Sequence, residues 1–408
     1  MKVPAGWTST LLHHVAEVRS GLSKNAKREG PTIKKPYLRV ANVQDGFLDL
    51  SEVKEIDVPT NQVSRFALKS GDLLLIEGNG NPENLGRGCL WEGQIPDCVH
   101  QNHVFAVRAL PGVGLLPRFL ALQLQSDHGR NYLLSCAKGS TGLSTLNSAQ
   151  LREFPLFIPT IYEQQVITDA VLCWNNAIEK TERLIAAKER HYTHELSRLI
   201  SQGKHPHSHV GKLAHEVSKR NRGGKWRTVA LAGIATICKG QQLNKDAMVE
   251  DGAYFVLNGG IKPSGRTTEW NCEADTITVS EGGNSCGFVT YNSEDFWCGG
   301  HCYALKKLTK NVDAHYLFHY LKGKQARLMA LRVGSGLPNI QKSDIESFSV
   351  ILPDLTTQSA IARYLNTLRE EIGVLGRSVE VLKTQKRGLM QKLLTGQWRV
   401  TIPKTEAA

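Results

Sequence analysis

The chain has 408 residues, 41% of them apolar and 22% charged, which is enough for two or three folded domains. No run of about 18 apolar residues is present and the first residues are too polar for a signal peptide, so we expect neither a membrane protein nor a secreted one. The net charge of +12 favours a polyanionic partner, most commonly nucleic acid. Nine scattered cysteines, an odd number, predict free thiols in a cytoplasmic protein.

The first block, residues 1–153, is predicted to be a domain of short strands and Gly- and Asn-rich turns. A β-rich run from Gly71 to Asn79 enters such a turn, and a helix is expected near the end of the block, from Leu116 to Ala137. The block opens with a spaced set of residues that recurs later in the chain: Trp7, Leu12, Val15 and Gly21.

Residues 154–203 are predicted to form a long helix, with Thr160 and Glu163 fitting a capping box at its start. Apolar residues recur at alternating steps of four and three, which is typical of a coiled coil. About 36 helical residues at the rise of an α-helix would span roughly 54 Å. The predicted seam of this helix contains Ile167, Val171, Trp174, Ile178 and Ile185.

Residues 204–222 are basic and poor in apolar side chains, so they are predicted to form an exposed linker. The second block, residues 223–347, again shows strands, turns and a late helix, here from Val312 to Leu331. It opens as the first block does, with Trp226, Leu231, Ile234 and Gly240 at the same spacing.

Further correspondences between the two blocks are expected. Tyr254 and Asn258 are the proposed counterparts of Tyr37 and Asn42, and the run from Ala274 to Gly282 resembles the run from Gly71. The middles of the blocks diverge, so a framework has been kept while the loops on it differ.

Residues 348–397 repeat the first long helix at a constant shift, with Phe348 matching Phe154 and Gln358 matching Gln164. Two long seams of equal length would most simply bury each other, so we expect an antiparallel coiled coil with internal pseudo-twofold symmetry. The alternative is a pair of helices buried in separate domains. Residues 398–408 are predicted to be a tail. The second seam contains Ile361, Leu368, Leu375, Leu382 and Leu389.

Side chains suited to DNA gather in both blocks. Lysine and arginine neutralise phosphates without reading sequence, whereas asparagine, glutamine and arginine can pair with base edges. Each residue alone is more often a solvated loop residue, but two different polar sets on one frame favour sequence recognition. The candidates in the first block are Lys24, Lys27, Arg28, Lys34, Lys35, Arg39, Asn79, Asn81, Asn84 and Arg87. Those in the second block are Lys239, Gln241, Gln242, Lys245, Lys262, Arg266, Asn284, Asn339 and Gln341.

Catalytic motifs are missing from the sequence. It contains no phosphate-binding loop, no zinc-protease motif and no nucleophile elbow. The stretch from Glu77 to Asn84 lacks the second proline and the aromatic residue of an amino-methyltransferase motif. A zinc site is conceivable at Cys272, Cys286, Cys298, His301 and Cys302, but only one end of this set is close-spaced, so buried thiols are the preferred interpretation.

The order of parts carries a family resemblance. Two variable domains alternate with two near-duplicate long helices, and each domain closes on a Gly-Leu pair, at Gly142 and at Gly336. The sequence Leu-Leu-Thr-Gly-Gln-Trp-Arg-Val runs from Leu393 to Val400, across the boundary between the last helix and the tail. In this order the whole chain resembles the specificity subunit of a Type I restriction–modification system, although the start of the first helix, from Ile158 to Gln164, is a looser version of the family's proline-rich start.

The resemblance implies an α+β fold and a non-catalytic DNA reader without a cofactor of its own. Each variable domain would be a target recognition domain for one half of a bipartite, asymmetric sequence in double-stranded DNA. The helices would set the gap between the halves and carry two modification subunits, which bind S-adenosylmethionine and methylate adenine. A separate motor and endonuclease subunit would use Mg and ATP to translocate and cleave DNA.

Two other interpretations remain open on the sequence alone. The same reader could serve a fused methyltransferase–nuclease, as in systems that resemble the Type IIB class. Alternatively, the chain could be a coiled-coil scaffold whose basic charge is incidental.

Overall fold

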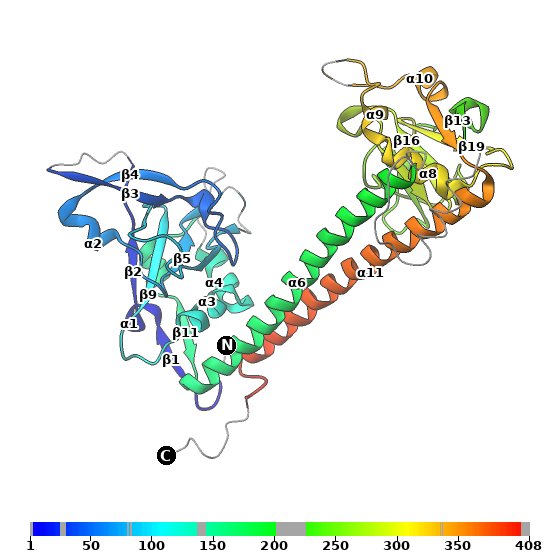
Figure 1. Cartoon of the computed structure of the whole chain (residues 1–408). Coiled ribbons are helices and arrows are strands. Elements are labelled where there is room, and N and C mark those ends of the chain that lie inside the picture. Colours follow the sequence, from blue (N-terminus) through cyan, green and yellow to red (C-terminus); the bar gives the residue numbers. More distant parts are fainter. Residues whose placement is uncertain are drawn as a thin grey trace. The chain divides into compact units, whose positions relative to one another are not determined.

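The computed structural model describes residues 3–24, 30–79, 81, 84–136, 144–200, 226–334, 336 and 338–400. Lys27, Arg28, the predicted linker and residues 401–408 of the predicted tail lie outside this set. The chain divides into two compact units, unit 1 with Met1–Lys180 and Val379–Ala408, and unit 2 with Thr181–Ser378. Each unit contains one α+β domain together with part of each of the two long helices (Figure 1).

The domain of unit 1 is built on two sheets and a separate strand pair. The four-stranded sheet has the order β2-β9-β5-β7, and the three-stranded sheet has the order β4-β3-β8, in which β3 and β8 are parallel. The strand pair β1·β11 is antiparallel. These strands are β1 (Thr8–Leu11), β2 (Ala16–Ser20), β3 (Thr32–Leu38), β4 (Lys54–Pro59), β5 (Leu73–Ile76), β7 (Gly88–Leu90), β8 (Val99–His100), β9 (Val104–Ala109) and β11 (Pro155–Ile158).

The domain of unit 2 repeats these two sheets and this strand pair strand for strand, whereas a further short pair of unit 1, β6 (Gly78–Asn79) with β10 (Ser144–Thr145), is matched only by the single bridge between Gly282 and Asn339. Its sheets have the orders β13-β19-β16-β17 and β15-β14-β18, again with one parallel pair, and β12 pairs with β20. The repeat predicted from sequence is therefore confirmed at the level of the fold. The strands are β12 (Arg227–Ala230), β13 (Thr236–Lys239), β14 (Tyr254–Leu257), β15 (Gly265–Thr267), β16 (Thr276–Ser280), β17 (Val289–Asn292), β18 (Phe296–Cys298), β19 (Cys302–Lys306) and β20 (Ser349–Leu352).

The helix expected from Leu116 to Ala137 is two helices, because Ser126 has extended backbone angles between them. Its Oγ accepts a hydrogen bond from Gly129 N at 3.2 Å, so Ser126 caps the second helix. Lys324 interrupts the helix of unit 2 in the same region. The domain helices are α3 (Pro117–Gln125), α4 (Asp127–Cys136) and α5 (Ser148–Arg152) in unit 1, and α8 (Ala314–Gly323), α9 (Gln325–Met329) and α10 (Lys342–Glu346) in unit 2.

Short elements complete the domains. They are α1 (Leu12–Val15), α2 (Val63–Phe66), β6 (Gly78–Asn79) and β10 (Ser144–Thr145), with 3-10 turns at Val40–Asn42, Thr60–Gln62, Leu231–Gly233, Lys245–Ala247 and Gly283–Ser285.

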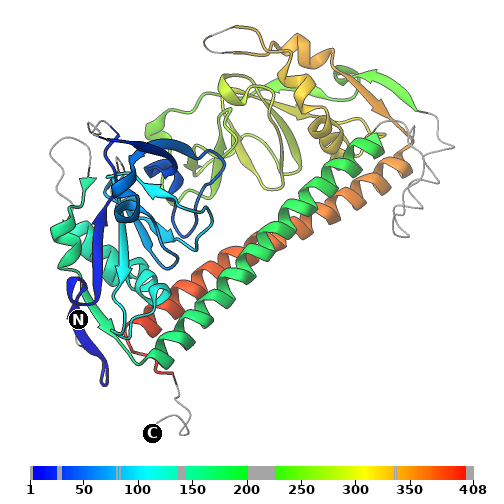
Figure 2. The ribbon, with the colours of Figure 1, turned by 60° about the vertical axis from the view of Figure 1, so that its left-hand side comes forward.

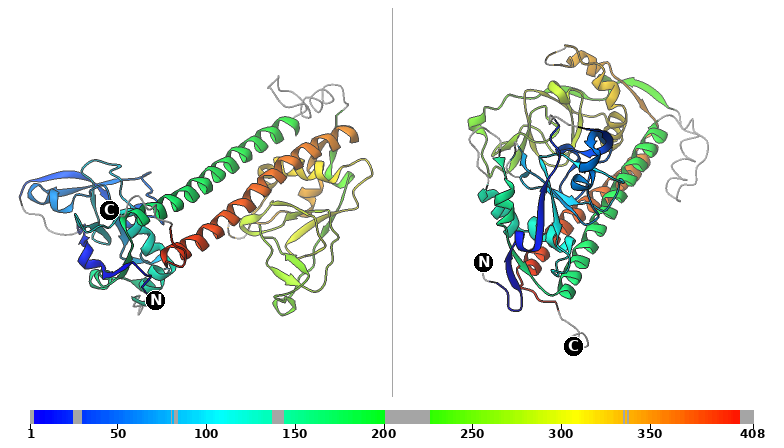
Figure 3. Two further views of the ribbon diagram at one scale, coloured as in Figure 1. Left: turned by 90° about the horizontal axis from the view of Figure 1, so that it is seen from below. Right: turned by 90° about the vertical axis from the view of Figure 1, so that its left-hand side faces the viewer.

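The two long helices, α6 (Ile161–Ile200) and α11 (Leu355–Leu394), each have 40 residues. In unit 1 the start of α6 shares a core with the end of α11, through Ile167 and Leu393. In unit 2 the end of α6 shares a core with the start of α11, through Leu199 and Leu365. The helices therefore run antiparallel, as Figure 2 and Figure 3 show. Within the described residues, no helix combines the length and apolar character needed to cross a membrane.

Burial along the predicted seam is uneven. Ile167, Val171, Ile178, Ile361 and Leu368 are buried. The remaining predicted seam residues are only half-buried, and they are Trp174, Ile185, Leu375, Leu382 and Leu389.

The stretch before each long helix is a strand, not helix, although it lies inside the predicted helical ranges. The helix α6 begins after Thr160, whose Oγ1 accepts a hydrogen bond from Glu163 N at 3.3 Å. Asp354 caps α11 in the same way, accepting from Thr357 N at 3.0 Å. In a capping box the Glu163 side chain would also accept a hydrogen bond from the backbone N–H of Thr160. Here that side chain instead binds Trp7 and Arg399.

Glu163 joins the two ends of the chain in unit 1. Its buried carboxylate accepts a hydrogen bond from Trp7 Nε1 at 3.2 Å and two from Arg399, at 2.8 and 3.0 Å. Arg399 also donates to the carbonyl of Ala5. A bidentate arginine–carboxylate pair fixes direction as well as distance, so the segment after α11 is held against the residues that precede β1 and against the start of α6.

A buried glutamine fixes the first turn of each long helix. Gln164 Oε1 accepts from Leu116 N at 2.8 Å, and its Nε2 donates to Gly114 O at 2.8 Å and to Pro159 O at 3.0 Å. Gln358 makes the same three bonds in unit 2: it accepts from Asp313 N at 2.9 Å and donates to Asn311 O at 3.1 Å and Pro353 O at 2.9 Å. Each amide thereby ties three segments together: the start of a long helix, the strand before it and the loop before a domain helix.

The substitution Gln164→Met tests this bond set. It keeps the volume but removes the partner of three backbone groups, on the buried Pro159, the half-buried Leu116 and the exposed Gly114, and leaving a buried group unpaired costs about 1–3 kcal/mol. We expect the free energy of unfolding to fall by roughly 3 kcal/mol, measured by urea denaturation. Gln165→Met is the matched control, because Gln165 is exposed and its side-chain amide donates to Asp169 on the same helix. Equal unfolding midpoints for the two variants would contradict the role given to Gln164.

Candidate nucleic-acid interface

The chain reversals at one end of each four-stranded sheet have the same backbone bonding in both units. In unit 1, Leu22 N donates to His100 O, Gln101 N to Leu38 O and Glu77 N to His103 O, at 2.8, 2.9 and 2.9 Å. In unit 2, the matching bonds are Gln241 N to Cys298 O, Gly299 N to Leu257 O and Glu281 N to His301 O, each at 2.9 Å. We call the residues that these bonds gather loop face 1 (21–24, 39–42, 77–79 and 101–103) and loop face 2 (240–242, 258–260, 281–284 and 299–301).

The glycine that ends the opening pattern of each block is explained by this packing. A Cβ on Gly21 would collide with the carbonyl of His100, and one on Gly240 would collide with the carbonyls of Gly299 and Cys298. The chain therefore crosses at a point that admits no side chain.

These bonds show which residues of the two domains are equivalent, and three of the equivalences predicted from sequence are wrong. Leu38 and Leu257 occupy equivalent positions, so Val256 is the counterpart of Tyr37, and Asn258 is the counterpart of Arg39. The predicted pairs Tyr37 with Tyr254 and Asn42 with Asn258 are wrong. The run from Gly71 is likewise offset by one residue, because Glu77 matches Glu281 rather than Ser280.

In unit 1 several of the predicted DNA-contacting cations already have partners inside the protein. Lys35 Nζ lies 2.7 Å from Asp97 Oδ2, and the Arg39 guanidinium lies 3.1 Å from Glu52 Oε2. Arg87 Nε donates to Val43 O at 3.1 Å. Lys34 and Lys35 lie on β3 rather than in a loop. Lys24, Lys34 and Asn81 are exposed and Asn84 is half-buried; of Asn79 only the backbone is described, in β6.

The predicted residues of unit 2 fall into two groups. Lys239 binds Glu281, and Arg266 donates to Gly252 O and Ala253 O at 2.5 and 2.8 Å. The backbone of Asn339 bridges to Gly282 and so borders loop face 2. The exposed group consists of Gln241, Gln242, Lys245, Lys262, Asn284 and Gln341, of which Gln341 stands at the start of α10.

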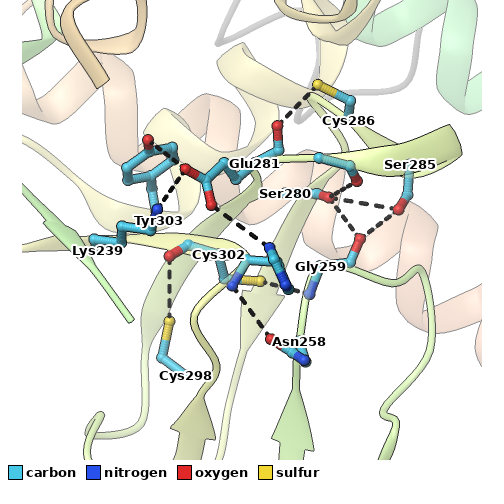
Figure 4. Close-up of polar contacts among 12 residues, drawn as sticks. Lys239, Asn258, Gly259, Ser280, Glu281, Ser285, Cys286, Cys298, Cys302 and Tyr303 are labelled. Carbon is cyan, nitrogen blue, oxygen red and sulfur yellow. Dashed lines mark hydrogen bonds and ion pairs between the residues drawn. The ribbon is translucent and has the colours of Figure 1, made fainter. Parts of the chain in front are cut away.

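Glu281 is the centre of loop face 2 (Figure 4). Its carboxylate is buried, and its Oε1 lies 2.7 Å from Lys239 Nζ and accepts a hydrogen bond from Tyr303 OH at 3.0 Å. Burial and this hydrogen bond raise the pKa of Tyr303, so the phenol remains a donor. His301 Nδ1 lies 3.8 Å from the other oxygen, Oε2. The carboxylate thus holds two basic side chains at the rim of the face.

Loop face 1 contains the equivalent pair, with His103 Nδ1 2.6 Å from Glu77 Oε2. Neither pair was predicted from sequence, since His301 was considered only as a zinc ligand and His103 was not among the candidate residues. A signal was available, because both histidines stand immediately before matching strands, β9 and β19.

The five cysteines of unit 2 are free thiols, and all except the half-buried Cys238 are buried. Cys272, Cys298 and Cys302 share one small apolar cluster. The sulfur of Cys302 accepts a hydrogen bond from Gly259 N at 3.0 Å, and Cys286 Sγ contacts the carbonyl oxygen of Glu281 at 3.0 Å. In the part of the chain that the structure describes, no group of three or more His, Cys, Asp or Glu residues is arranged to hold a metal ion. The sulfur atoms serve packing and backbone hydrogen bonds instead.

Known proteins share this organisation. The family model for the Type I restriction modification DNA specificity domain matches residues 4–187 and 223–382. A putative type I specificity subunit of Mycoplasma pneumoniae is 31% identical over 179 residues, which is 43% of this chain and 48% of that protein, so the chain matches about half the length of this relative.

Two other similarities extend over nearly the whole chain. A putative type I restriction enzyme specificity subunit of Methanocaldococcus jannaschii is 23% identical over 438 residues, covering 98% of this chain and 95% of that one. The crystal structure of a Type I restriction–modification S subunit from M. genitalium has the same fold, with a TM-score of 0.61, 17% identity and 99% coverage of both chains.

The domain of unit 1 should lose stability in acid because of His100, the last residue of β8. His100 is buried with Nδ1 2.7 Å from Val104 O, and burial lowers its pKa from 6.5 to about 4. The folded state therefore keeps the ring neutral where the unfolded chain takes up a proton, so this contribution is complete above pH 6.5 and is lost as the pH falls toward about 4. We expect the free energy of unfolding to decrease across this window in urea titrations. In His100→Met the decrease should be smaller, and an unchanged pH dependence in that variant would contradict the assignment to His100.

Proposed function

This chain belongs to the family of Type I restriction–modification DNA specificity subunits, and from that premise we propose that it is the sequence-recognition subunit of such a complex. One observation carries the proposal. The two domains have the same strand order in their four- and three-stranded sheets. At the equivalent end of its four-stranded sheet, each domain presents different polar side chains. In this role the chain is non-catalytic, and each domain reads one half of a bipartite, asymmetric sequence in double-stranded DNA.

The loop faces supply the chemistry for two different readings. Matching positions hold Leu22 and Gln241, and Arg39 and Asn258. Glutamine and asparagine favour bidentate contacts with adenine, whereas arginine favours guanine or phosphate. Domains with a common frame but these different groups are suited to half-sites of different sequence. We retain the predicted domain limits, residues 1–153 and 223–347, and the DNA-contacting residues as part of this proposal.

The long helices are assigned two tasks. A 40-residue helix is roughly 60 Å long, so the antiparallel pair is suited to setting the gap between half-sites. It also offers a long exposed surface for two modification subunits. In such a complex S-adenosylmethionine serves those subunits, which methylate adenine, and Mg and ATP serve the motor and endonuclease subunits. No observation favours a fused methyltransferase–nuclease partner or a simple scaffold.

A domain exchange tests the proposal. The structure refines the junction, because β1 pairs with β11 and Trp7 binds Glu163, so residues 12–153 should be replaced while these contacts stay native. With a donor domain of different specificity, sequencing of methylated adenines in the host genome should show a change in one half of the target only.

The matched exchange of residues 231–347 keeps β12 and its pairing with β20. It should change the other half of the target and leave the first half intact. A change in both halves after either exchange would show that the domains do not read independently.

A further inference from the structure

Both loop faces carry the same carboxylate–imidazole pair, Glu77 with His103 and Glu281 with His301. We propose that each pair is a sequence-independent DNA contact, in which the protonated ring donates from Nε2 to a phosphate of the DNA backbone. This inference rests on the proposed function, and it adds two residues, His103 and His301, to the candidates predicted from sequence.

The backbone presents both pairs in the same way. The glutamate is the first residue after β5 or β16, and the histidine is the last residue before β9 or β19. In each pair the N–H of the glutamate donates to the carbonyl of the histidine at 2.9 Å. This bond continues the ladder of the four-stranded sheet by one step, so the two side chains leave a rigid part of the domain rather than a mobile loop.

The carboxylate lies beneath the ring. The side chains of His103 and His301 are 55% and 63% exposed, whereas those of Glu77 and Glu281 are only 30% and 6% exposed. In both pairs it is Nδ1 that faces the carboxylate, at 2.6 and 3.8 Å. The other ring nitrogen, Nε2, points away from the carboxylate by the geometry of imidazole. Asn102 Nδ2 lies 3.3 Å from His103 Nε2, so in loop face 1 the phosphate oxygen would replace this amide as the partner of Nε2.

Retention in both domains favours a phosphate over a base as the ligand. The residues next to the pairs differ, since Gln101 and Asn102 in loop face 1 correspond to Gly299 and Gly300 in loop face 2. Half-sites of different sequence require such differences at base-reading positions. Phosphates are the same in every sequence and position a protein without specifying bases. A pair that is the same in both domains, while its neighbours differ, is therefore suited to contact a phosphate of the DNA backbone.

Charge also favours a protonated ring. A carboxylate facing DNA without compensation would repel it, and histidine is a side chain that can carry a positive charge near neutral pH. In loop face 2, Lys239 compensates Glu281 from one side, which leaves Oε2 to His301. The ring then presents its positive edge outward while the glutamate fixes its orientation.

The experiment uses the full chain assembled with its modification subunits and the substitutions His103→Gln and His301→Gln. Affinity is measured by fluorescence anisotropy at several salt concentrations for a duplex with the methylated target and for an unrelated duplex. Loss of one charged hydrogen bond should weaken both complexes about tenfold. The slope of log K against log salt should become shallower by about 0.9 per substitution. His103→Lys restores a positive donor and should restore the slope.

The control is His13→Gln. His13 Nδ1 lies 3.5 Å from Glu153 Oε1, so this pair has the same chemistry, but it lies on α1, at the opposite end of β2 from loop face 1. Neither affinity nor salt slope should change. The proposed function is tested separately, because it requires the wild-type complex to bind its methylated target more tightly than the unrelated duplex. The proposed function and the inference about the histidines can therefore be disproved independently of each other.

Three outcomes would overturn the inference. Relaxed preference at one base pair would identify His103 or His301 as a base-reading residue. Weaker binding with an unchanged salt slope would show that no charge is lost, and unchanged affinity together with an unchanged slope would leave the pairs a purely structural role.

Discussion

A buried amide at the first turn of each long helix is the interaction on which the arrangement of each unit depends. The fully buried side chains of Gln164 and Gln358 each bond three backbone groups, one of them on a buried proline. An unpaired buried carbonyl or N–H is costly, so the helix cannot rotate or slide by one residue without breaking the whole set. Apolar seams alone would leave that freedom, because Leu-, Ile- and Val-rich surfaces pack in several registers. The hydrogen bonds of the glutamines therefore fix the orientation of each domain on its helix, which apolar packing alone would leave variable.

Antiparallel pairing then gives each domain a second attachment. The domain of unit 1 is joined covalently to the start of α6 and packs on the end of α11, through Leu393 and Leu394. The domain of unit 2 reverses the arrangement, being joined to the start of α11 and packed on Leu196 and Leu199 of α6. The symmetry is broken at one position. Glu163 gathers Trp7 and Arg399 in unit 1, whereas its counterpart Thr357 bonds only locally, to Asp354.

The sequence was sufficient for the parts of the fold that depend on period and order. The heptad pattern predicted the two long helices, and the repeated spacing of Trp, Leu and Gly predicted the common frame of the two domains. The glycines recur because a side chain at Gly21 or Gly240 would collide with a neighbouring carbonyl group. The register of the strands could not be predicted from sequence. Backbone hydrogen bonds set it, and equivalent positions in the two domains need not carry the same side chain. Tyr37 therefore corresponds to Val256 and not to the nearby Tyr254. The break at Ser126 was visible in principle, as a serine that competes with the helix by bonding to its backbone.

The candidate interface shows why counting basic residues is a poor guide to DNA contacts. The surplus of +12 charges includes Lys35, Arg39 and Lys239, each of which is held by a carboxylate of the same domain. Such a cation gains less from a phosphate than an exposed lysine does, because it exchanges one anion for another. It also loses less side-chain entropy, because its direction is already set. Exposed lysines such as Lys24 are thus suited to affinity, and cations held by carboxylates to fixing the register of the domain on the duplex. The partner carboxylates, exposed in Asp97 and Glu52 and buried in Glu281, would be passed over by a search for positive charge, yet they are the groups that orient these cations.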